Sequence, residues 1–488
     1  MSPTQPLLNL FAAGSLLASA IAAPSAITVS VDSQVPGFAI PDDFAGLSFE
    51  TWAERPDRSG VRGYLFSGTN SQLITLFTNS GIRNLRLGGC TVEGLKAAVP
   101  DHADIDSVFG FARAAGLRVI YSLPLLNGDE AEAAASAKYI WERYPSSLAG
   151  FAIGNEPDVK SYRYPPFGNG TDPGITNYSS YLALWQRFAA ACRHAAPGVR
   201  FVGPDAAAIS GEWAARFIKD ASGCCLLMLA TQHEYVGGKP FVNGGRQDMP
   251  ALEAIDHMLS ENWVTNKYPA YYRETAAPIA TQGLGCRLTE ANDYLHGVTN
   301  ASNAFASALW ALDYMHWWAA HGCAGVNFHN NQHTEWLKTD TVYLDSSSGE
   351  YKVNPKAYAI KAFDLGSHGR SLPVVLKDAA GVNLTAYAVA GPSKLWITVI
   401  NKEHGAAARD AVLGLVLAGV SPKSAQVMLL TAPHNDPGAT SAITLGGALI
   451  TNHEPWRGQW VSLPPGPHHR YEVTVSATSA AVVELPMD

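Results

Sequence analysis

Between residues 44 and 330, short apolar runs alternate with longer stretches in which apolar residues recur every three or four positions. Short apolar runs bounded by turn residues predict buried strands, and the longer spacing predicts amphipathic helices. The predicted strands are residues 44–50, 82–87, 117–123, 148–154, 199–203, 226–234, 286–290 and 323–328. The predicted helices include residues 105–115, 131–143, 178–196, 211–221, 251–261 and 301–320.

The helical spacing is clearest in residues 178–196, where Tyr181, Trp185 and Phe188 share one face and Pro197 ends the stretch. Strands that alternate with helices over this length predict an α/β fold, a (β/α)8 TIM barrel. A doubly wound open sheet is the alternative. It would carry a Gly-x-Gly-x-x-Gly motif after its first strand, and this chain has none there.

After about residue 341 the pattern changes to short β-rich runs separated by Gly, Pro and Asn, which predicts a C-terminal antiparallel β-sandwich domain. Residues 27–35 also alternate between apolar and polar side chains, and we expect this strand to leave the barrel and complete the C-terminal sheet. The expected domains are a barrel over residues 40–340 and a sandwich of residues 24–38 plus 341–488.

The charge balance limits the classes of partner. Charged residues make up 16% of the 488 positions, the formal net charge is -8, and no block of Lys or Arg occurs. These features exclude nucleic acid and an anionic membrane surface as expected partners, and no obligate protein partner is evident. They do not exclude an anionic sugar, because such a sugar needs only local hydrogen-bond donors or positive groups.

The N-terminus predicts export. Residues 7–23 are apolar and rich in small side chains, which is typical of a signal peptide spanning residues 1–22. An apolar tail that stays on the chain is the alternative, since residues 1–9 lack Lys and Arg. We therefore expect a secreted, extracellular protein with N-glycosylation candidates at Asn169, Asn177, Asn300 and Asn383.

Cysteine usage gives no sign of a metal site. The chain has six cysteines, no Cys-x-x-Cys pair and no interleaving with His at ligand spacing, so neither a metal nor an organic cofactor is expected. Six cysteines permit fifteen disulfide connectivities, and the sequence does not choose among them. Structural links or plain buried thiols are expected at Cys224, Cys225, Cys286 and Cys323.

Two glutamates follow strand-like runs. Glu156 comes directly after the fourth predicted strand, between Asn155 and Pro157, and Glu290 ends the seventh. In a parallel barrel the strand C-termini converge on one face. Two carboxylates facing each other there are the apparatus that cleaves a glycosidic bond. Asn155 offers both a donor and an acceptor to a sugar hydroxyl.

The motifs around these residues resemble clan A of the retaining glycoside hydrolases, and more closely glycoside hydrolase family 79, which contains β-glucuronidases and heparanase-like enzymes. The resemblance spans nearly the whole mature chain. It rests on Gly46-Leu-Ser-Phe-Glu50, Leu85-Arg-Leu-Gly-Gly89, Phe151-Ala-Ile-Gly-Asn-Glu-Pro157, Gly203-Pro-Asp205, Gln232-His-Glu-Tyr235 and Glu290-Ala-Asn-Asp-Tyr294.

The resemblance implies a double-displacement mechanism in which Glu156 is the acid/base and Glu290 the nucleophile. Arg86 is expected to help keep Glu290 ionised. His233 and Tyr235 stand one strand before the nucleophile, where a donor could orient its carboxylate. Strand packing is the alternative for this pair, and a structural ion pair is the alternative for Arg86.

Further residues are assigned by the resemblance. Glu50 is expected to bind sugar hydroxyls, with a capping carboxylate as the alternative. Tyr294 is expected to hold a uronate carboxylate, with an aromatic wall as the alternative. Asp205 is interpreted as a helix N-cap.

The chain departs from the family after strand eight, where relatives tend to carry a Gly-rich loop. Here side chains of His329, Asn330 and Gln332 are expected to donate hydrogen bonds to substrate, with an ordinary polar loop as the alternative.

The sequence thus predicts a secreted retaining exo-β-glucuronidase that removes terminal β-linked glucuronic acid or 4-O-methylglucuronic acid from glycans. One alternative is a clan A β-glycosidase acting on a neutral sugar. The other is an inactive hydrolase-fold protein that binds carbohydrate. Trp310, Tyr314, Trp317 and Trp318 recur at helical spacing and are interpreted as packing of a helix on the barrel.

Overall fold

The computed structural model describes most of the chain from residue 27 onward. The described ranges are 27–57, 63–93, 99–126, 128–159, 177–207, 212–223, 226–238, 241–242, 247–330, 338–379, 381–419, 422–466 and 470–487. Five predictions lie outside these ranges: the signal peptide over residues 1–22, the glycosylation candidate Asn169, the roles of Cys224 and Cys225, and the donor Gln332.

The predicted barrel is confirmed. Parallel strands close on themselves in the order β10-β11-β2-β3-β4-β5-β6-β7. They are β2 (Ala45–Glu50), β3 (Asn84–Gly88), β4 (Arg118–Leu123), β5 (Leu148–Ile153), β6 (Arg200–Ala206), β7 (Leu226–Tyr235), β10 (Gly285–Asn292) and β11 (Cys323–Asn330). Their buried apolar side chains explain why the sequence reads as continuous apolar runs rather than alternating ones.

Several barrel strands extend beyond their predicted C-terminal ends. β6 runs to Ala206, β10 to Asn292 and β11 to Asn330, past the last apolar residue of each run. The polar residues among those added are buried, so an apolar pattern alone does not include them: Asp205, Asn292, His329 and Asn330. They therefore belong to the strands of the barrel instead of loops.

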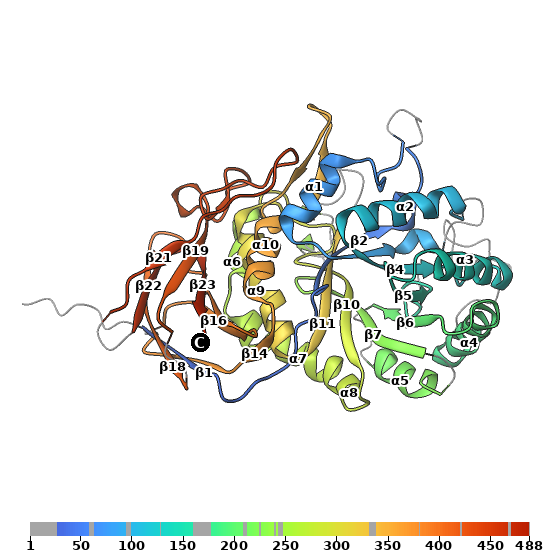
Figure 1. The fold of residues 1–488 in the computed structure, drawn as a ribbon, viewed down its shortest axis with the longest axis horizontal. Coiled ribbons are helices and arrows are strands. Elements are labelled where there is room, and N and C mark those ends of the chain that lie inside the picture. The colour runs from blue at the N-terminus through green and yellow to red at the C-terminus, as the bar shows by residue number, and fades with distance from the viewer. Residues whose placement is uncertain are drawn as a thin grey trace, which may run out of the picture.

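Helices surround the barrel (Figure 1). They are α1 (Ser71–Ser80), α2 (His102–Ala115), α3 (Glu130–Arg143), α4 (Tyr178–Ala195), α5 (Glu212–Ala221), α6 (Ala251–Met258), α7 (Tyr268–Glu274), α8 (Ala276–Ala280), α9 (Phe305–Ala320) and α10 (Lys356–Gly366). Local chemistry fixes several ends. Asp101 and Asp104 form a capping box at α2, and Gly81 ends α1 in a left-handed conformation.

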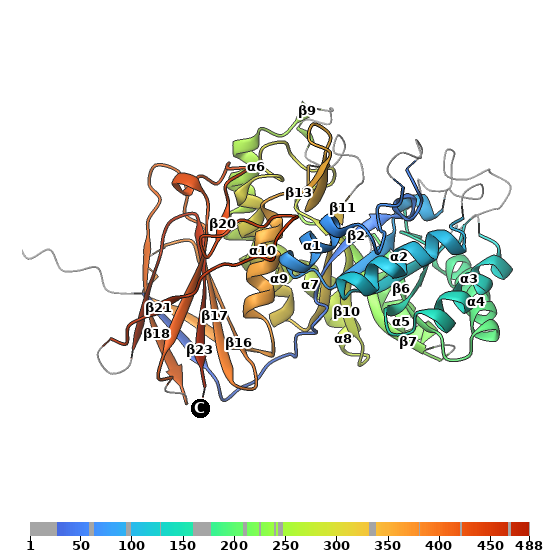
Figure 2. The ribbon, with the colours of Figure 1, turned by 45° about the horizontal axis from the view of Figure 1, so that its top comes forward.

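The C-terminal domain is the expected sandwich, and the prediction for the N-terminal strand is confirmed. β1 (Ile27–Asp32) pairs with β15 (Val374–Lys377) and β18 (Ala411–Ala418), and β22 (Tyr471–Val475) completes that sheet. The facing sheet comprises β14 (Arg370–Leu372), β16 (Leu384–Ala390), β17 (Lys394–Asn401), β19 (Ala425–Thr431), β20 (Thr444–Leu445), β21 (Val461–Leu463) and β23 (Ser479–Pro486). In Figure 2 the blue N-terminal strand lies among the orange and red strands.

The junction between the domains differs from the predicted change at residue 341. A hairpin of β12 (Val342–Asp345) and β13 (Glu350–Val353) comes first, and α10 follows. α10 is buried along most of its length and packs against α1 and α9 of the barrel as well as β17, β19 and β23 of the sandwich. A helix buried on several sides lacks a clear polar face, so its periodicity is weak in the sequence.

α9 and α10 lie between the two domains (Figure 1). Trp310, Tyr314 and Trp318 of α9 are at most 1% exposed, which confirms their interpretation as packing residues. Asp313 of the same helix forms a buried ion pair with Lys402 of the sandwich at 2.8 Å. The two domains therefore share one continuous buried interface.

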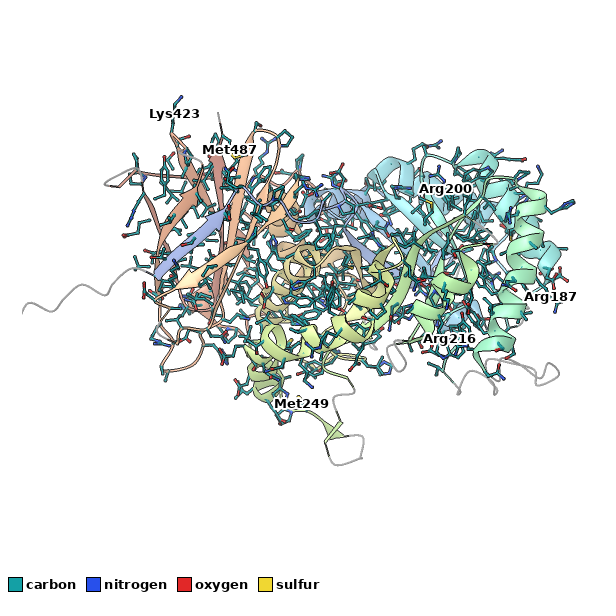
Figure 3. The ribbon with its side chains drawn as sticks, turned by 90° about the horizontal axis from the view of Figure 1, so that it is seen from below. Arg187, Arg200, Arg216, Met249, Lys423 and Met487 are labelled. Carbon is teal, nitrogen blue, oxygen red and sulfur yellow. The ribbon has the colours of Figure 1, made fainter. Side chains whose placement is uncertain are left out.

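Two further findings concern surface charge and cysteines. Seen from below, the labelled Arg187, Arg200 and Arg216 are dispersed around the barrel instead of forming one basic patch (Figure 3). Cys286 and Cys323 are register partners on β10 and β11, and both are buried free thiols. No helix among the described residues is long and apolar enough to span a membrane.

Candidate active site

The two predicted catalytic carboxyls meet at the C-terminal end of the barrel. Glu156 follows β5, and Glu290 lies near the end of β10. One oxygen of each carboxyl and one ring nitrogen of His233 lie within 4.8 Å of one another. The side chains are 14% and 9% exposed, so both carboxyls are mostly screened from solvent but remain reachable.

Backbone geometry aims Glu156 into this mouth. Its φ is 44°, a left-handed value that is costly for a residue with a side chain. The preceding Gly154 has a φ of 86°, which glycine adopts readily. The Glu156 amide donates to the carbonyl of Asp205 at 2.8 Å, which fixes the turn. A strained conformation held by its surroundings is typical of functional positions.

Glu290 is surrounded by donors and positive charge. Arg86 Nη1 donates to its Oε2 at 2.7 Å, and the Tyr235 hydroxyl donates to its Oε1 at 2.7 Å. Burial by itself would raise the pKa of this carboxyl. Positive charge and hydrogen bonding outweigh burial and lower the pKa of Glu290 to about 2, through His329, His233, Arg86 and Tyr235. Glu290 is therefore ionised at any ordinary working pH.

Arg86 is fully buried inside the barrel, so it acts on protein groups and does not present its charge to solvent. Besides Glu290, its guanidinium donates to Ser48 Oγ at 3.2 Å, to Asn155 Oδ1 at 2.7 Å and to Asp205 Oδ2 at 2.8 Å. Burial disfavours the charged form, but the two carboxylates raise the pKa of Arg86 further above its usual range. Its expected influence on Glu290 agrees with this geometry, whereas direct sugar binding does not.

Asn155 has one amide atom engaged and one available. Its Oδ1 accepts from Arg86, while its buried Nδ2 has no hydrogen-bond partner within the described residues. Buried polar atoms normally have partners, and exceptions gather at functional sites. The free donor agrees with the expectation that Asn155 binds a sugar hydroxyl.

Asp205 does not act as the expected helix N-cap. It lies inside β6 with no exposed surface, where its carboxylate accepts from Arg86 and from Thr289 Oγ1 at 2.7 Å. The sequence suggested a cap because Asp is a preferred N-cap residue. β6 instead continues through Pro204 to Ala206, which places Asp205 inside the strand.

His233 links the acidic groups. Its Nδ1 lies 2.9 Å from Glu156 Oε1 and 3.8 Å from Glu290 Oε2. Burial would lower the pKa of the imidazole. The negative charge of Glu290, the nearby Asp205 carboxylate and the hydrogen bond to Glu156 outweigh burial and raise the pKa of His233 to about 10. The expected position near the nucleophile is correct, but the direct partner is Glu156.

Glu50 and His329 form the wall nearest to β2. Glu50 accepts from the amide and the hydroxyl of Thr91 at 2.9 and 2.7 Å and from the Cys90 amide at 3.3 Å. It thus holds the short 3-10 helix Cys90–Val92, which agrees with its capping alternative. His329 Nε2 lies 3.7 Å from Glu50, and its Nδ1 lies 3.2 Å from Ser48 Oγ.

Two predicted substrate-binding residues are directed elsewhere. Asn330 is fully buried: its Oδ1 accepts from the amides of Thr341 and Val342, and its Nδ2 donates to the Phe328 carbonyl. The side chain is therefore used to hold Thr341 and Val342, at the start of β12, against β11. The sequence shows a polar residue at a strand end, but not which groups it meets.

Tyr294 is 1% exposed and packs against the loop at Gly237, where an added Cβ would lie 2.2 Å from its ring. Its hydroxyl donates to the Ala254 carbonyl at 3.4 Å, toward α6 and away from the carboxyl pair. This position supports the aromatic-wall alternative over a direct contact with a uronate.

Sequence reasoning missed two carboxyls that hold the turn bearing Glu156. Glu93 accepts from the amides of Asn155, Leu125 and Leu126, and burial raises its pKa to about 7. Asp158 accepts from the Ala207 amide at 2.8 Å, and burial raises its pKa to about 6. Glu93 lies just beyond β3 and the Leu85–Gly89 motif, but the amides that it accepts from are distant in the sequence, so only its position in the fold reveals its role. Asp158 stands two positions after Glu156, which was an available signal.

A cation site is electrostatically disfavoured at the carboxyl pair. Glu156, His233 and Glu290 are close enough together to hold a metal ion. However, the Arg86 guanidinium lies 2.7 Å from Glu290 Oε2 and 3.3 Å from His233 Nε2. This fixed positive charge already compensates the negative charge of the carboxylates and would repel a metal ion bound between them.

Comparisons with known proteins bear on the fold. No protein-family model matches the chain, and no curated protein matches its sequence, so the resemblance to family 79 stays a prediction. Among solved structures, the chain is similar to a 4-O-α-L-rhamnosyl-β-D-glucuronidase from Fusarium oxysporum, with a TM-score of 0.68 and 18% identity over 94% of this chain and 100% of that one.

Other similar structures carry different specificities. A family 51 α-L-arabinofuranosidase from Bifidobacterium longum has a TM-score of 0.64 and 15% identity over 94% of this chain and 99% of that one. A GH39 enzyme from Xanthomonas axonopodis has a TM-score of 0.61 and 15% identity over 97% of this chain and 100% of that one. At such identities the shared property is the fold, a barrel with a second β-domain.

Proposed function

We propose that this protein is an O-glycoside hydrolase, a secreted retaining exo-β-glucuronidase. The observation that carries the proposal is the carboxyl pair at the barrel mouth. Carboxyl oxygens of Glu156 and Glu290 lie within 4.8 Å. Two carboxyls whose nearest oxygens approach this closely support a retaining pair, in which the carboxyl groups stand roughly 5–5.5 Å apart.

The surroundings of Glu290 suit the role of the nucleophile. Glu290 is held ionised by Arg86 and Tyr235, so its carboxylate attacks the anomeric carbon while Glu156 gives its proton to the departing oxygen. A glycosyl ester of Glu290 results. Glu156 then takes a proton from water, the hydroxide attacks the same carbon, and the ester bond to Glu290 breaks.

The substrate proposal is a glucuronic acid or 4-O-methylglucuronic acid at a β-linked chain end. It is supported by the sequence motifs and by the fold shared with a structure described as a glucuronidase. His329 stands beside Glu50 at the site, and in this proposal it donates a hydrogen bond to the acidic sugar.

One observation favours a second candidate. Tyr294 and Asn330, which were expected to hold the uronate carboxylate, are directed toward protein groups. A β-glycosidase acting on a neutral sugar would not need such donors. The third reading, an inactive carbohydrate-binding protein, has less support because both carboxyls are in place and Glu290 is held ionised.

The decisive experiment assays the full chain, expressed in a secreting host, on the p-nitrophenyl β-D-glucuronide, glucoside, galactoside and xyloside. We expect activity in the medium, on the glucuronide alone, with a loss of at least roughly 10³-fold in Glu290→Gln. Release from a neutral glycoside would overturn the substrate, and activity retained inside the cells would overturn secretion. No release from any of the four, or activity preserved in Glu290→Gln, would contradict the proposed exo-acting hydrolase.

A further inference from the structure

Asp205 forms hydrogen bonds with residues on several strands that surround the two glutamates. It has no exposed surface and a φ of 53°, a left-handed conformation. Its carboxylate accepts from Arg86 and Thr289, and its backbone carbonyl accepts the Glu156 amide. Its own amide donates to Thr231 Oγ1 at 2.9 Å. One residue thus ties β3, β6, β7, β10 and the turn of Glu156 together.

A protonated His233 imidazole needs a negative charge on its inner side. Its Nδ1 faces Glu156 and Glu290, but its Nε2 lies 3.3 Å from the Arg86 guanidinium. Like charges at that distance repel strongly in a buried site. Asp205 Oδ2 lies 3.8 Å from Nε2 and 2.8 Å from Arg86 Nη2, so it stands against both cations.

We propose that Asp205 is a positioning residue, whose carboxylate holds the cations of Arg86 and His233 together so that both act on the two catalytic carboxyls. This inference rests on the proposed glycosidase function. Arg86 reaches Glu290, and His233 reaches both Glu156 and Glu290. Asp205 touches neither the substrate position nor the reacting atoms, and its effect passes through these two side chains.

The electrostatic consequence has a definite sign. Burial disfavours the charged form of Asp205, but Arg86 and His233 hold the pKa of its carboxyl well below its usual range. The reverse effect of Asp205 on His233 keeps the imidazole charged, with a pKa raised to about 10. Loss of the Asp205 charge should therefore allow His233 to lose its proton at a lower pH than in wild type. Glu290 would then lose one of the charges that lower its pKa.

The test compares the wild-type protein with Asp205→Asn, which keeps the side-chain shape and removes the charge. Histidine labelled with nitrogen-15 reports by NMR whether one or both ring nitrogens carry a proton. The His233 signals are assigned by their absence from His233→Gln. We expect His233 to stay fully protonated through about pH 8 in wild type and to become neutral at least about one pH unit lower in Asp205→Asn.

Two controls separate this role from general loss of structure. Asp293→Asn removes another fully buried carboxylate, which accepts from Ser302 and Ser307, and it should lower stability without altering the His233 titration. Thr289→Val removes one hydrogen bond to Asp205 and leaves its charge, so His233 should remain protonated. A neutral His233 in wild type at pH 7, or an equal shift in Asp293→Asn, would overturn the proposal.

A kinetic arm uses whichever glycoside the wild-type enzyme cleaves. The ratio of kcat/KM in Asp205→Asn to that in wild type should fall as the pH rises through the range in which NMR shows His233 to lose its proton, and the same ratio for Asp293→Asn should stay constant. A constant ratio in Asp205→Asn across that range would overturn the proposal. Failure of the glycosidase function would show as silence of the wild type in this arm, while the NMR arm still decides the His233 titration.

Discussion

At the scale of the residue, the Tyr235 hydroxyl stabilises the ionised form of Glu290. Its hydroxyl donates to Glu290 Oε1 from the neighbouring strand, opposite Arg86 on Oε2, so each oxygen of the carboxylate has its own donor. Burial and the nearby negative charge of Glu290 raise the pKa of Tyr235 well above its ordinary value, so it remains a donor throughout the working range. A hydrogen bond to an ionised group contributes roughly 1.5–3 kcal/mol.

Tyr235→Phe is expected to lower kcat/KM by about 10- to 100-fold and to move its acid limb to higher pH. The carboxylate form of Glu290 loses a donor, so its pKa rises, and the ionised nucleophile is lost at a higher pH as the medium is acidified. A pH series of kcat/KM measures both effects. Tyr139→Phe removes a surface hydroxyl from Asp106 and serves as the matched control, with no change expected.

The segment after β11 illustrates the scale of the element. Asn330 is the last residue of that strand, and its amide oxygen receives the amides of Thr341 and Val342 at the start of β12. The hairpin β12–β13 is thereby held at a fixed distance from the barrel. A residue that the sequence assigns to substrate binding instead fixes the position of the following element.

Asn330→Ala distinguishes these two roles. Two buried amides would lose their acceptor, at a cost of roughly 1–3 kcal/mol each, so the variant should unfold at lower denaturant concentration than wild type. KM should change little, since the side chain has no free atom for a sugar. Chemical denaturation and substrate saturation curves measure the two quantities. A higher KM at unchanged stability would restore the substrate-binding role.

At the scale of the whole molecule, buried acids couple stability to pH. Glu54 and Glu234 are both buried, and desolvation raises the pKa of each to about 8, although Tyr314 donates a hydrogen bond to Glu234. In the unfolded chain a glutamate titrates near a pKa of about 4.3. The folded protein therefore binds more protons than the unfolded chain between these values, and its stability falls as pH rises through that window.

We expect the free energy of unfolding to be greatest at mildly acidic pH and to decrease from about pH 5 to pH 8. Each unit by which burial raises a carboxyl pKa contributes about 1.4 kcal/mol to this decrease. Glu290 and Asp205, with lowered pKa values, oppose this trend only in strong acid. Denaturant unfolding across this pH range is the measurement. Glu54→Gln should flatten the curve, and an equally steep curve in that variant would contradict the assignment to Glu54.

The local pattern of the sequence determined the order of elements, the barrel, the return of the N-terminal strand to the sandwich, and the two glutamates at strand ends. Each follows from periodicity or from residues adjacent in the chain. The interpretations of Trp310 and Trp318 as packing residues also needed nothing more than helical spacing.

Only the tertiary structure decided how polar side chains pair. Arg86 and Asp205 lie 119 positions apart and meet inside the barrel, while Asn330 and Tyr294 stand beside the motifs yet are directed to backbone carbonyls and amides. The sequence does not predict α10, because this helix is buried on several sides and lacks a clear polar face. Buried polar and charged side chains need partners, and the closed barrel brings together partners that are far apart in the sequence. The sequence alone therefore does not show which side chains pair.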